Sequence, residues 1–588
     1  MRLVISACAS LLLALGHPAL AQQPAAIHLN QVGFYPQAAK VAVVAGAGGQ
    51  SFYLARPGSS AAVFAGTLGP ARADALSQQT VRVADFSACR DTGTFVLAVP
   101  GVGASAPFRI APRAHRALAA AALKGFYYQR ASVALPPAYA GPWSRPAGHP
   151  DTRVLVHPSA AGPGRPAGTV LAAPGGWYDA GDYNKYVVNS GITLGTLLAL
   201  YEDFPAYCGQ LNEQIPESTN ALPDVLDEAL DNLRWLLTMQ DPADGGVYHK
   251  LTNASFDGMV MPSACTTPRY VVQKSTAAAL DFAAVLAQAS RVLRSFKGPL
   301  PGLADSCQHA ATRAWEWARL HPAVYYDQAA LNRQFQPAIS TGEYGDHDLR
   351  DEWQWAATEL YVATGQASYY QAAPLPAGPA APLPSWGQVR TLAHYTLLRH
   401  PAALAALGQP TARSVRQQVL ALADSLLAGA AASPYGTAMG HRAADYTWGS
   451  SSVAANQGIA LVQAYRLTGQ PRYWQAALAN LDYLLGRNAT GYCFVTGAGT
   501  RSPLHPHHRL SEADGVAVPV PGLLVGGPNP GRQDKCAYPS ALAPLAYSDA
   551  VCSYASNEVA INWQAPLVYL AAALEASQAA LPAAPARR

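Results

Sequence analysis

Two acidic residues stand three positions apart in a loop rich in glycine and aromatic residues. Residues 175–186 read GGWYDAGDYNKY, with the acids at Asp179 and Asp182. Two carboxylates this close repel each other unless they share a cation, a proton or a water molecule. Water held by one carboxylate and deprotonated by the other would be a nucleophile. A calcium loop, or a turn with two solvated acids, would look the same in the sequence.

A third acid, Glu558, lies far downstream in an apolar and aromatic setting. Residues 557–563 read NEVAINW, and Tyr554 lies four positions before the acid. Burial in such a setting favours the protonated form of a carboxylic acid, which a general acid needs near neutral pH. A water-activating acid and a protonatable acid are together what inverting hydrolysis of a glycosidic bond requires. The two segments therefore favour that chemistry over a calcium loop.

Three histidines and an arginine gather at the end of residues 496–509, TGAGTRSPLHPHHR. A metal site is one interpretation, because imidazole is a common zinc ligand. Arg501 and Arg509 disfavour a bound cation, however, and Pro506 breaks the spacing that places two histidine ligands on one helix face. On these grounds a metal site is disfavoured here.

Three tryptophans, Trp177, Trp448 and Trp563, are candidate platforms for a sugar ring. An aromatic face binds the apolar face of a pyranose, because both surfaces are flat and poorly hydrated. For any one of them alone, packing in the core is an equally good explanation.

A dense acidic loop, residues 342–352, reads GEYGDHDLRDE and ends at Asp351 and Glu352. Calcium prefers six to eight oxygen ligands, which such a loop can supply, although the spacing is not that of an EF-hand. The start of a helix also attracts acids by itself, so calcium and a charged helix terminus are both open interpretations.

These segments, in the order in which they follow one another along the chain, resemble glycoside hydrolase family 9, the inverting cellulases. The resemblance runs from Ile27 to about Leu574 and rests on several separated motifs. It implies that Asp182 is the general base that deprotonates water, that Asp179 helps to position this water, and that Glu558 protonates the departing glycosidic oxygen. In an inverting enzyme the carboxyls of base and acid stand ~6.5–9.5 Å apart, which leaves room for the water.

The resemblance also predicts how the substrate is held. It implies that the histidine and arginine of a His-x-Arg signature hydrogen-bond the substrate and hold the geometry of the site. It places one tryptophan in a sugar-stacking loop, and two aromatic residues would surround the general acid. The predicted substrate-binding residues are His507, Arg509, Trp177, Trp448, Tyr554 and Trp563.

Two further acidic positions match the family with less defined roles. Asp549 is a candidate supporting carboxylate for catalysis, but a structural role in binding backbone amides is favoured. Asp351 and Glu352 match the family's calcium-binding pair, so a structural calcium is a candidate ligand. No cofactor is expected for the chemistry itself.

A structural zinc is not expected. Many relatives bind zinc near the start of the catalytic domain with cysteine and histidine ligands. In the resembling stretch, Ala131 and Gly148 stand where those relatives have cysteines, and only His149 remains. A single imidazole cannot hold zinc against water.

The whole chain has the composition of a core-rich globular protein. Of its 588 residues, 50% are hydrophobic and 13% are charged, and the net charge of +4 is too small for this length to indicate a nucleic acid partner. Residues 1–21 have the pattern of a cleavable signal peptide, which predicts a secreted or periplasmic protein with no membrane partner. Seven cysteines follow it, an odd number, and a bond between Cys536 and Cys552 is one pairing that the sequence leaves open.

The sequence predicts a multidomain fold. Short β-rich runs between turns predict a β-sandwich over 22–112, which resembles the immunoglobulin-like domain of many family 9 enzymes. Helical periodicity then predicts an all-α catalytic domain over 113–580, followed by a disordered tail, 581–588. About a dozen helices without strand alternation favour a toroid of helix pairs, the (α/α)6 barrel of this family. The predicted helices span 116–128, 224–239, 276–293, 351–362, 388–398, 414–427, 453–467, 472–485 and 558–574.

Three segments are too long to be simple connections, namely 133–180, 240–270 and 492–550, and loops of this length usually build a site. The resulting prediction is a secreted inverting endo-β-1,4-glucanase that acts on a β-glucan polysaccharide or oligosaccharide. An exo-acting glucosidase or glucosaminidase of the same family is the alternative. A carbohydrate-binding protein that has lost catalysis is disfavoured, because Asp182 and Glu558 are both present. The oligomeric state stays open.

Overall fold

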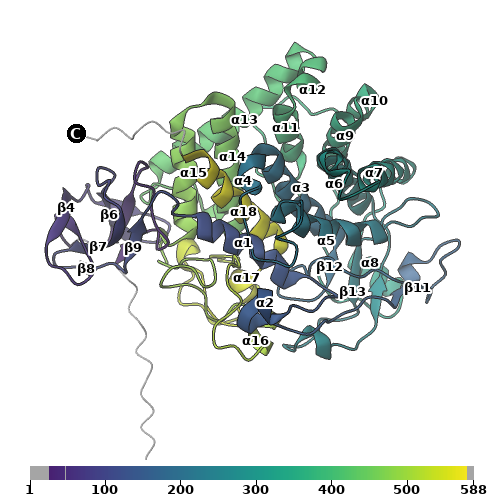
Figure 1. The fold of residues 1–588 in the computed structure, drawn as a ribbon, viewed down its shortest axis with the longest axis horizontal. Coiled ribbons are helices and arrows are strands. Elements are labelled where there is room, and N and C mark those ends of the chain that lie inside the picture. The colour runs from purple at the N-terminus through teal and green to yellow at the C-terminus, as the bar shows by residue number, and fades with distance from the viewer. Residues whose placement is uncertain (1–25, 47, 579–588) are drawn as a thin grey trace, which may run out of the picture.

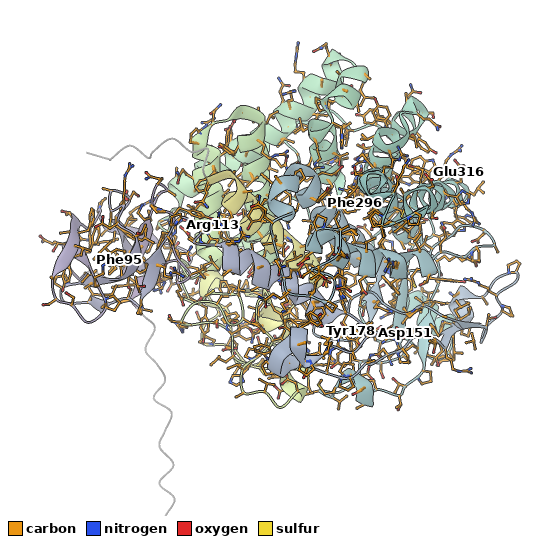
Figure 2. All side chains as sticks on the ribbon, in the orientation of Figure 1. Phe95, Arg113, Asp151, Tyr178, Phe296 and Glu316 are labelled. Atoms are coloured by element: carbon orange, nitrogen blue, oxygen red, sulfur yellow. A yellow bond between two sulfur atoms is a disulfide. The ribbon has the colours of Figure 1, made fainter. Side chains whose placement is uncertain are left out.

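The computed structural model describes residues 26–46 and 48–578, so the predicted signal peptide, 1–21, and tail, 581–588, lie outside the described residues. The described chain starts with a β-domain and continues into a larger, mainly helical domain that lies beside it (Figure 1). Arg113 lies at the junction of the two domains (Figure 2).

Two antiparallel sheets form the β-domain. One has the order β1-β2-β6-β5, and the other has the order β4-β3-β7-β8 with β9 paired to β7. In β7 the side chains of Phe95, Leu97 and Val99 are buried while their neighbours are not, because alternate residues of a strand face opposite sides. The strands are β1 (Ile27–His28), β2 (Val41–Ala45), β3 (Ser51–Ala55), β4 (Ala62–Thr67), β5 (Arg72–Asp74), β6 (Gln79–Asp85), β7 (Gly93–Val99), β8 (Gly103–Ala104) and β9 (Phe108–Ile110).

Helices dominate the second domain. The long ones are α1 (Arg116–Gln129), α3 (Val187–Asp203), α5 (Asp224–Thr238), α6 (Thr276–Leu293), α7 (Leu303–Leu320), α9 (Arg350–Thr364), α11 (Arg390–Arg399), α13 (Gln409–Ala432), α14 (Ser450–Thr468), α15 (Pro471–Leu484) and α18 (Ile561–Ser577). The short ones are α2 (Pro137–Ala140), α4 (Pro205–Cys208), α8 (Gln328–Gln334), α10 (Ala367–Ala372), α12 (Pro401–Ala406), α16 (Arg509–Ala513) and α17 (Tyr554–Asn557). Each predicted helical range overlaps one of these helices, and α3 and α7 are additional.

Helix α6 lies at the centre of this packing. Its N-terminus is capped by Ser275, whose Oγ accepts a hydrogen bond from the amide of Ala278 at 3.2 Å. Its many alanines allow α3, α7 and α9 to pack closely against it. By length and hydropathy alone α6 would pass for a membrane span, but 94% of its apolar window is buried inside the molecule. It is therefore explained as a core helix.

Seven helices form a closed circuit of neighbours. Helix α18 packs on α3, and the contacts then run through α6, α9, α11, α13 and α14 back to α18. Several of these helices end at one buried charge cluster. The Asp203 carboxylate, at the C-terminus of α3, accepts hydrogen bonds from Arg399 of α11 at 2.7 and 2.9 Å, and it also bonds Arg466 of α14 and Tyr569 of α18. The C-terminal ends of α3, α11 and α14 are thereby fixed together.

A five-stranded sheet interrupts the helical domain. Its order is β11-β10-β14-β13-β12, from β10 (Val154–Val156), β11 (Val170–Leu171), β12 (Lys185–Tyr186), β13 (Lys250–Asn253) and β14 (Arg269–Val271). The prediction of a helical domain without strands is therefore wrong in this respect. These strands are two to four residues long and pair across distant parts of the chain, so they leave no alternating pattern in the sequence. They join the predicted loops 133–180 and 240–270 into one layer.

The β-domain is attached to the helical domain by polar side chains near its first strand. Asn30 Nδ2 donates to Asp482 of α15 at 2.8 Å. Gln31 accepts from the amides of Thr500 and Arg501 at 2.9 and 2.8 Å and donates to the carbonyl of Gly491 at 2.9 Å. The β-domain therefore contacts the segment that leads to the histidine cluster.

Candidate active site

A cleft of about 840 Å³ opens at the N-terminal ends of α3, α14 and α18. It is at the opposite end of α3 from the Asp203 cluster. Most of the residues predicted from the sequence line it, although they come from segments far apart in the chain. These are Asp179, Asp182, Trp448, His507, Arg509, Tyr554, Glu558 and Trp563.

Gly181 explains how the two catalytic segments meet. A side chain at this position would place its Cβ 2.1 Å from the carbonyl oxygen of His507, so only glycine allows this approach. The same position lies 3.2 Å from Glu558 Oε1. On either side, the amide of Ile561 donates to the carbonyl of Asp179 at 2.8 Å, and Ala180 forms a bridge with Ala560. The loop with the two aspartates is thus joined directly to the segment with the glutamate.

Asp179 lines the cleft and is held by two hydrogen-bond donors. Asn189 Nδ2 donates to its Oδ1 at 2.6 Å, and the Tyr344 hydroxyl donates to its Oδ2 at 2.8 Å. Burial and the charge of Asp182 raise the pKa of Asp179 well above its ordinary value. The pair therefore does not ionise as two independent acids.

Asp182 is also held by two donors. Its Oδ2 accepts hydrogen bonds from Asn184 Nδ2 at 2.5 Å and from the Tyr186 hydroxyl at 3.2 Å. Tyr186 is itself fixed, because its hydroxyl accepts from the amide of Gly342 at 3.0 Å. The Asp182 side chain lines the cleft, so its carboxylate can act on a molecule bound there.

Glu558 lies just before α18, in extended backbone, and not within the helix as the predicted range had it. Its carbonyl accepts from the amide of Gly526 at 2.9 Å, and its backbone pairs with His507 in a parallel bridge. Burial and the charges of Asp182 and Asp179 raise the pKa of Glu558 well above its usual range, although Arg509 opposes this. The side chain is therefore suited to donate a proton.

The histidine and arginine lie beside these acids. His507 Nδ1 bonds the carbonyl of Val551 at 2.6 Å, which orients its ring, and Tyr554 packs edge-on against that ring. Arg509 Nη1 donates to the carbonyl of Gly181 at 2.8 Å, so its guanidinium also holds the catalytic loop in place. A disulfide between Cys536 and Cys552 closes the segment that precedes Tyr554.

Two of the predicted tryptophans lie in the cleft, and one does not. The Trp448 side chain is 41% exposed and its ring lies 5.6 Å from that of Tyr554, whereas Trp563 forms part of the wall. The prediction that Trp177 stacks on a sugar is wrong. Its side chain has no exposed surface and packs on Phe126 with ring centroids 4.5 Å apart, so it is core.

Asp549 has the structural role that the sequence favoured. Its carboxylate accepts from the amides of Leu504 and His505 at 2.9 and 3.0 Å and from Asn557 Nδ2 at 3.1 Å. These bonds hold the histidine segment against the segment that carries Glu558. Asp549 is not part of the cleft wall.

Several residues of the cleft were not identified from the sequence. Tyr344 lies in the acidic loop 342–352, which was interpreted only as a calcium loop. Phe256 lies in loop 240–270, which was expected to build a site, but nothing in the sequence distinguishes it from the aromatic residues around it. Trp386 lies in a proline-rich segment whose sequence does not indicate a functional site. All three line the cleft.

The predicted calcium pair lies in the first turn of α9. Asp351 accepts from the amide of Val389 at 2.6 Å. Glu352 is fully buried, and among the residues that the structure describes neither of its carboxylate oxygens has a hydrogen-bond partner. The carboxylate of Asp281, on α6, is likewise buried without a partner. Orphaned acidic oxygens fit a cation that prefers oxygen ligands. Calcium here stays a prediction.

Comparison with known proteins adds independent information. The profile of glycosyl hydrolase family 9 matches residues 115–571, and the profile of the cellulase N-terminal immunoglobulin-like domain matches residues 22–104. The xyloglucan-specific endo-β-1,4-glucanase of Bacteroides ovatus is 48% identical over 552 residues, which is 94% of this chain and 94% of that protein.

Solved structures agree with these matches. A family 9 glycoside hydrolase of Bacteroides ovatus superposes with a TM-score of 0.88 at 46% identity, covering 94% of this chain and 99% of that chain. AaCel9A, in complex with a cellobiose-like isofagomine, has a TM-score of 0.83 at 36% identity, covering 94% of this chain and 99% of that chain.

Proposed function

The chain belongs to glycosyl hydrolase family 9, and from this membership we propose that it is an exported endo-β-1,4-glucanase that cleaves its glucan with inversion. The observation that carries the proposal is the direct contact between the loop of Asp179 and Asp182 and the segment of Glu558. This contact gives the cleft a proton acceptor and a proton donor together.

In the proposed reaction, Asp182 accepts a proton from the attacking water. The water oxygen forms a bond to the anomeric carbon as the glycosidic C–O bond breaks, and Glu558 gives its proton to the departing oxygen. Asp179, fixed by Asn189 and Tyr344, orients the water beside Asp182. We expect the carboxyls of Asp182 and Glu558 to stand ~6.5–9.5 Å apart, as inversion requires.

The aromatic side chains along the cleft support a polymeric substrate. Trp448 and Tyr554 lie next to each other at one part of the wall, and Trp386 and Phe256 contribute elsewhere. Aromatic faces bind pyranose rings at successive positions. Because the similar Bacteroides ovatus enzyme is specific for xyloglucan, we propose a β-1,4-glucan backbone as substrate, with xyloglucan the first polysaccharide to test.

The proposal is tested with three glucans: xyloglucan, mixed-linkage β-glucan and carboxymethylcellulose. Viscosity and newly formed reducing ends are followed together, with the Asp182→Asn variant as the blank. An endo-acting enzyme lowers viscosity before many reducing ends appear. Release of single sugars at constant viscosity would instead establish the exo-acting alternative. No reducing ends from any of the three would contradict the proposed function.

Two structural proposals accompany the function. We propose that the helical domain is an (α/α)6 barrel and that most helices of the closed circuit belong to its inner ring, which the common end of α3, α11 and α14 supports. We further propose domain limits at 22–112 and 113–580 and cleavage of a signal peptide after Ala21. Sequencing the N-terminus of the exported protein tests the last point, because the mature chain would begin at Gln22.

A further inference from the structure

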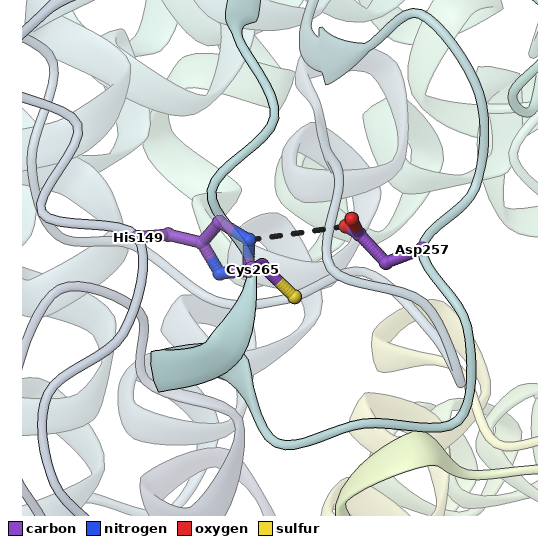
Figure 3. A group of neighbouring side chains, drawn as sticks. All are labelled: His149, Asp257 and Cys265. Carbon is purple, nitrogen blue, oxygen red and sulfur yellow. Dashed lines mark ion pairs between the residues drawn. The ribbon is translucent and has the colours of Figure 1, made fainter.

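Three side chains with metal-binding atoms converge outside the cleft. They are His149, Asp257 and Cys265, and their ligand atoms all lie within 4.8 Å of one another (Figure 3). His149 Nε2 is 3.9 Å from Asp257 Oδ2. No other group of three such residues is this close among residues 26–46 and 48–578.

The loop between β13 and β14 supplies Asp257 and Cys265. The same loop packs against positions 131 and 148, where relatives have zinc-binding cysteines. A side chain at Gly148 would place its Cβ 2.4 Å from the Cβ of Pro262, so no cysteine fits there while the loop holds its place. Ala131 is fully buried in an apolar cluster against which Met261 and Cys265 pack. Of the ligand positions that relatives use, His149 alone keeps a metal-binding residue, but a distant loop places two other metal-binding side chains beside it.

The imidazole of His149 is oriented as a metal ligand would be. The ring is buried, and its Nδ1 bonds the hydroxyl of Tyr178 at 2.9 Å. Its Nε2, which faces Asp257, has no hydrogen-bond partner in the described part of the chain. A ligating histidine usually has this arrangement, with one nitrogen fixed by a neighbour and the other free for the metal. The buried Nε2 is otherwise a cost to the fold.

We propose that His149, Asp257 and Cys265 bind one zinc ion, with water as the fourth ligand. A set of one nitrogen, one oxygen and one sulfur suits zinc better than calcium or magnesium, which prefer oxygen alone. Zinc bonds of this kind place ligand atoms about 3.3–3.8 Å apart, so the side chains need to move by about 1 Å. Cys265 carries no disulfide and would release its thiol proton to solvent on binding.

Four cationic side chains lie around the site. Arg269 and Lys185 pair with Asp151, at 2.9 and 2.7 Å. Arg145 and Arg509 donate to backbone carbonyls, so their charges have to be offset by the ligands themselves. A thiolate at Cys265 and a carboxylate at Asp257 would together balance the two charges of zinc. The Asp257 side chain is 10% exposed, which gives the ion a path from solvent.

The metal would fix a loop that reaches the cleft. Phe256, next to the ligand Asp257, lines the cleft and lies 5.6 Å from the Arg509 guanidinium. Arg509 Nε donates to the carbonyl of Asp257 at 2.9 Å. Loss of zinc should therefore loosen Phe256 and Arg509, so we expect KM for long glucans to rise while kcat changes little.

The test is metal analysis of the untagged full-length protein after dialysis against a weak chelator and reloading with zinc. We expect about one zinc per wild-type chain. Cys265→Ser and Asp257→Asn should each bind zinc at least about 100-fold more weakly, because even mutation of residues that only contact a ligand lowers metal affinity about 10–100-fold. His309→Gln and Asp348→Asn, which alter exposed side chains, are the matched controls and should retain zinc.

Cobalt replacement provides a second measurement that does not depend on the variants folding. Cobalt bound in the wild-type protein should show a thiolate-to-metal charge-transfer band, and zinc should protect Cys265 from alkylation in a peptide map. Zinc content no higher in the wild type than in folded Cys265→Ser, or a cobalt spectrum without the thiolate band, would overturn the proposal. Neither measurement depends on glucanase activity, so the zinc proposal is tested even if the proposed function is wrong.

Discussion

The two aspartates of the catalytic loop differ in their surroundings. Both side chains line the cleft, but Asp179 receives hydrogen bonds on both carboxylate oxygens, from Asn189 and Tyr344, whereas Asp182 receives both of its bonds on Oδ2. The raised pKa of Asp179 means that this carboxyl holds a proton more firmly than a free aspartate would. This difference supports the assignment of the base to Asp182.

At the residue scale, the first prediction concerns Glu558. Glu558→Gln should lower kcat on polysaccharide by about 10³-fold, because the leaving oxygen no longer receives a proton. An aryl glycoside with a good leaving group should be affected much less. The exposed Glu512→Gln is the matched control and should be unaffected. Equal losses on both substrates would show that Glu558 is not the acid.

The pH dependence of kcat/KM follows from the raised pKa of Glu558. Because Glu558 must be protonated and its pKa is raised, wild-type kcat/KM should fall as pH rises through that pKa. With the activated aryl glycoside, Glu558→Gln should lose this alkaline limb while an acidic limb remains. A limb that persists unchanged in the variant would assign it to another group.

At the element scale, Asp203 is the residue on which three helix ends depend. Burial would raise the pKa of Asp203, but Arg399 and Arg466 outweigh it and hold that pKa below its usual value. Asp203→Asn should cost about 3–5 kcal/mol in the free energy of unfolding, measured with urea at pH 7, because it removes the counterion of Arg466 and leaves the buried Arg399 with only Glu202, at 3.6 Å. Glu316→Gln removes an exposed ion pair and should cost no more than about 1 kcal/mol.

The pH dependence of this effect has a definite sign. A carboxyl with a lowered pKa contributes stability above its unfolded pKa, near about 3.9, and loses it as pH falls through its folded pKa. The difference between wild type and Asp203→Asn should therefore shrink in strong acid. A difference that stays constant would mean that the charge of Asp203 is not the cause.

The acidic N-terminal end of α9 should give a pH dependence of stability with the opposite sign. Burial and the charge of Asp281 raise the pKa of Glu352, so without calcium the folded protein keeps a proton that the unfolded chain releases above about pH 4.3. In chelator, the Tm of the wild type should fall between pH 5 and 8 relative to Glu352→Gln. Calcium should raise the Tm of the wild type only. An equal rise in both proteins would place calcium elsewhere.

At the scale of the whole molecule, the β-domain acts through Gln31. Its side chain satisfies two amides and one carbonyl in the segment 491–501, which leads to His507 and Arg509. Gln31→Ala should lower the free energy of unfolding by about 1–3 kcal/mol through these unpaired groups, and it should lower kcat/KM as well. Gln37→Ala, an exposed glutamine of the same domain, is the control. Lost stability with unchanged kcat/KM would limit the β-domain to a structural role.

The sequence was sufficient for features that depend on local patterns. Helical periodicity predicted α1, α5, α6 and α15 closely, and the short β-rich runs predicted the β-domain. Features that depend on contacts between segments far apart in the chain could not be predicted from the sequence. The short strands of the five-stranded sheet, the hydroxyl of Tyr344 on Asp179, and the burial of Trp177 on Phe126 all require the folded arrangement. The same holds for His149, whose metal-binding neighbours follow it by more than a hundred residues.

The most direct test of the account is the anomeric form of the first product. Proton NMR during early hydrolysis of a β-1,4-glucan distinguishes the two anomers before they interconvert. Attack by water opposite the leaving group, with Asp182 as base and Glu558 as acid, predicts that the α-anomer appears first. Initial appearance of the β-anomer would contradict the assignment of both carboxylates.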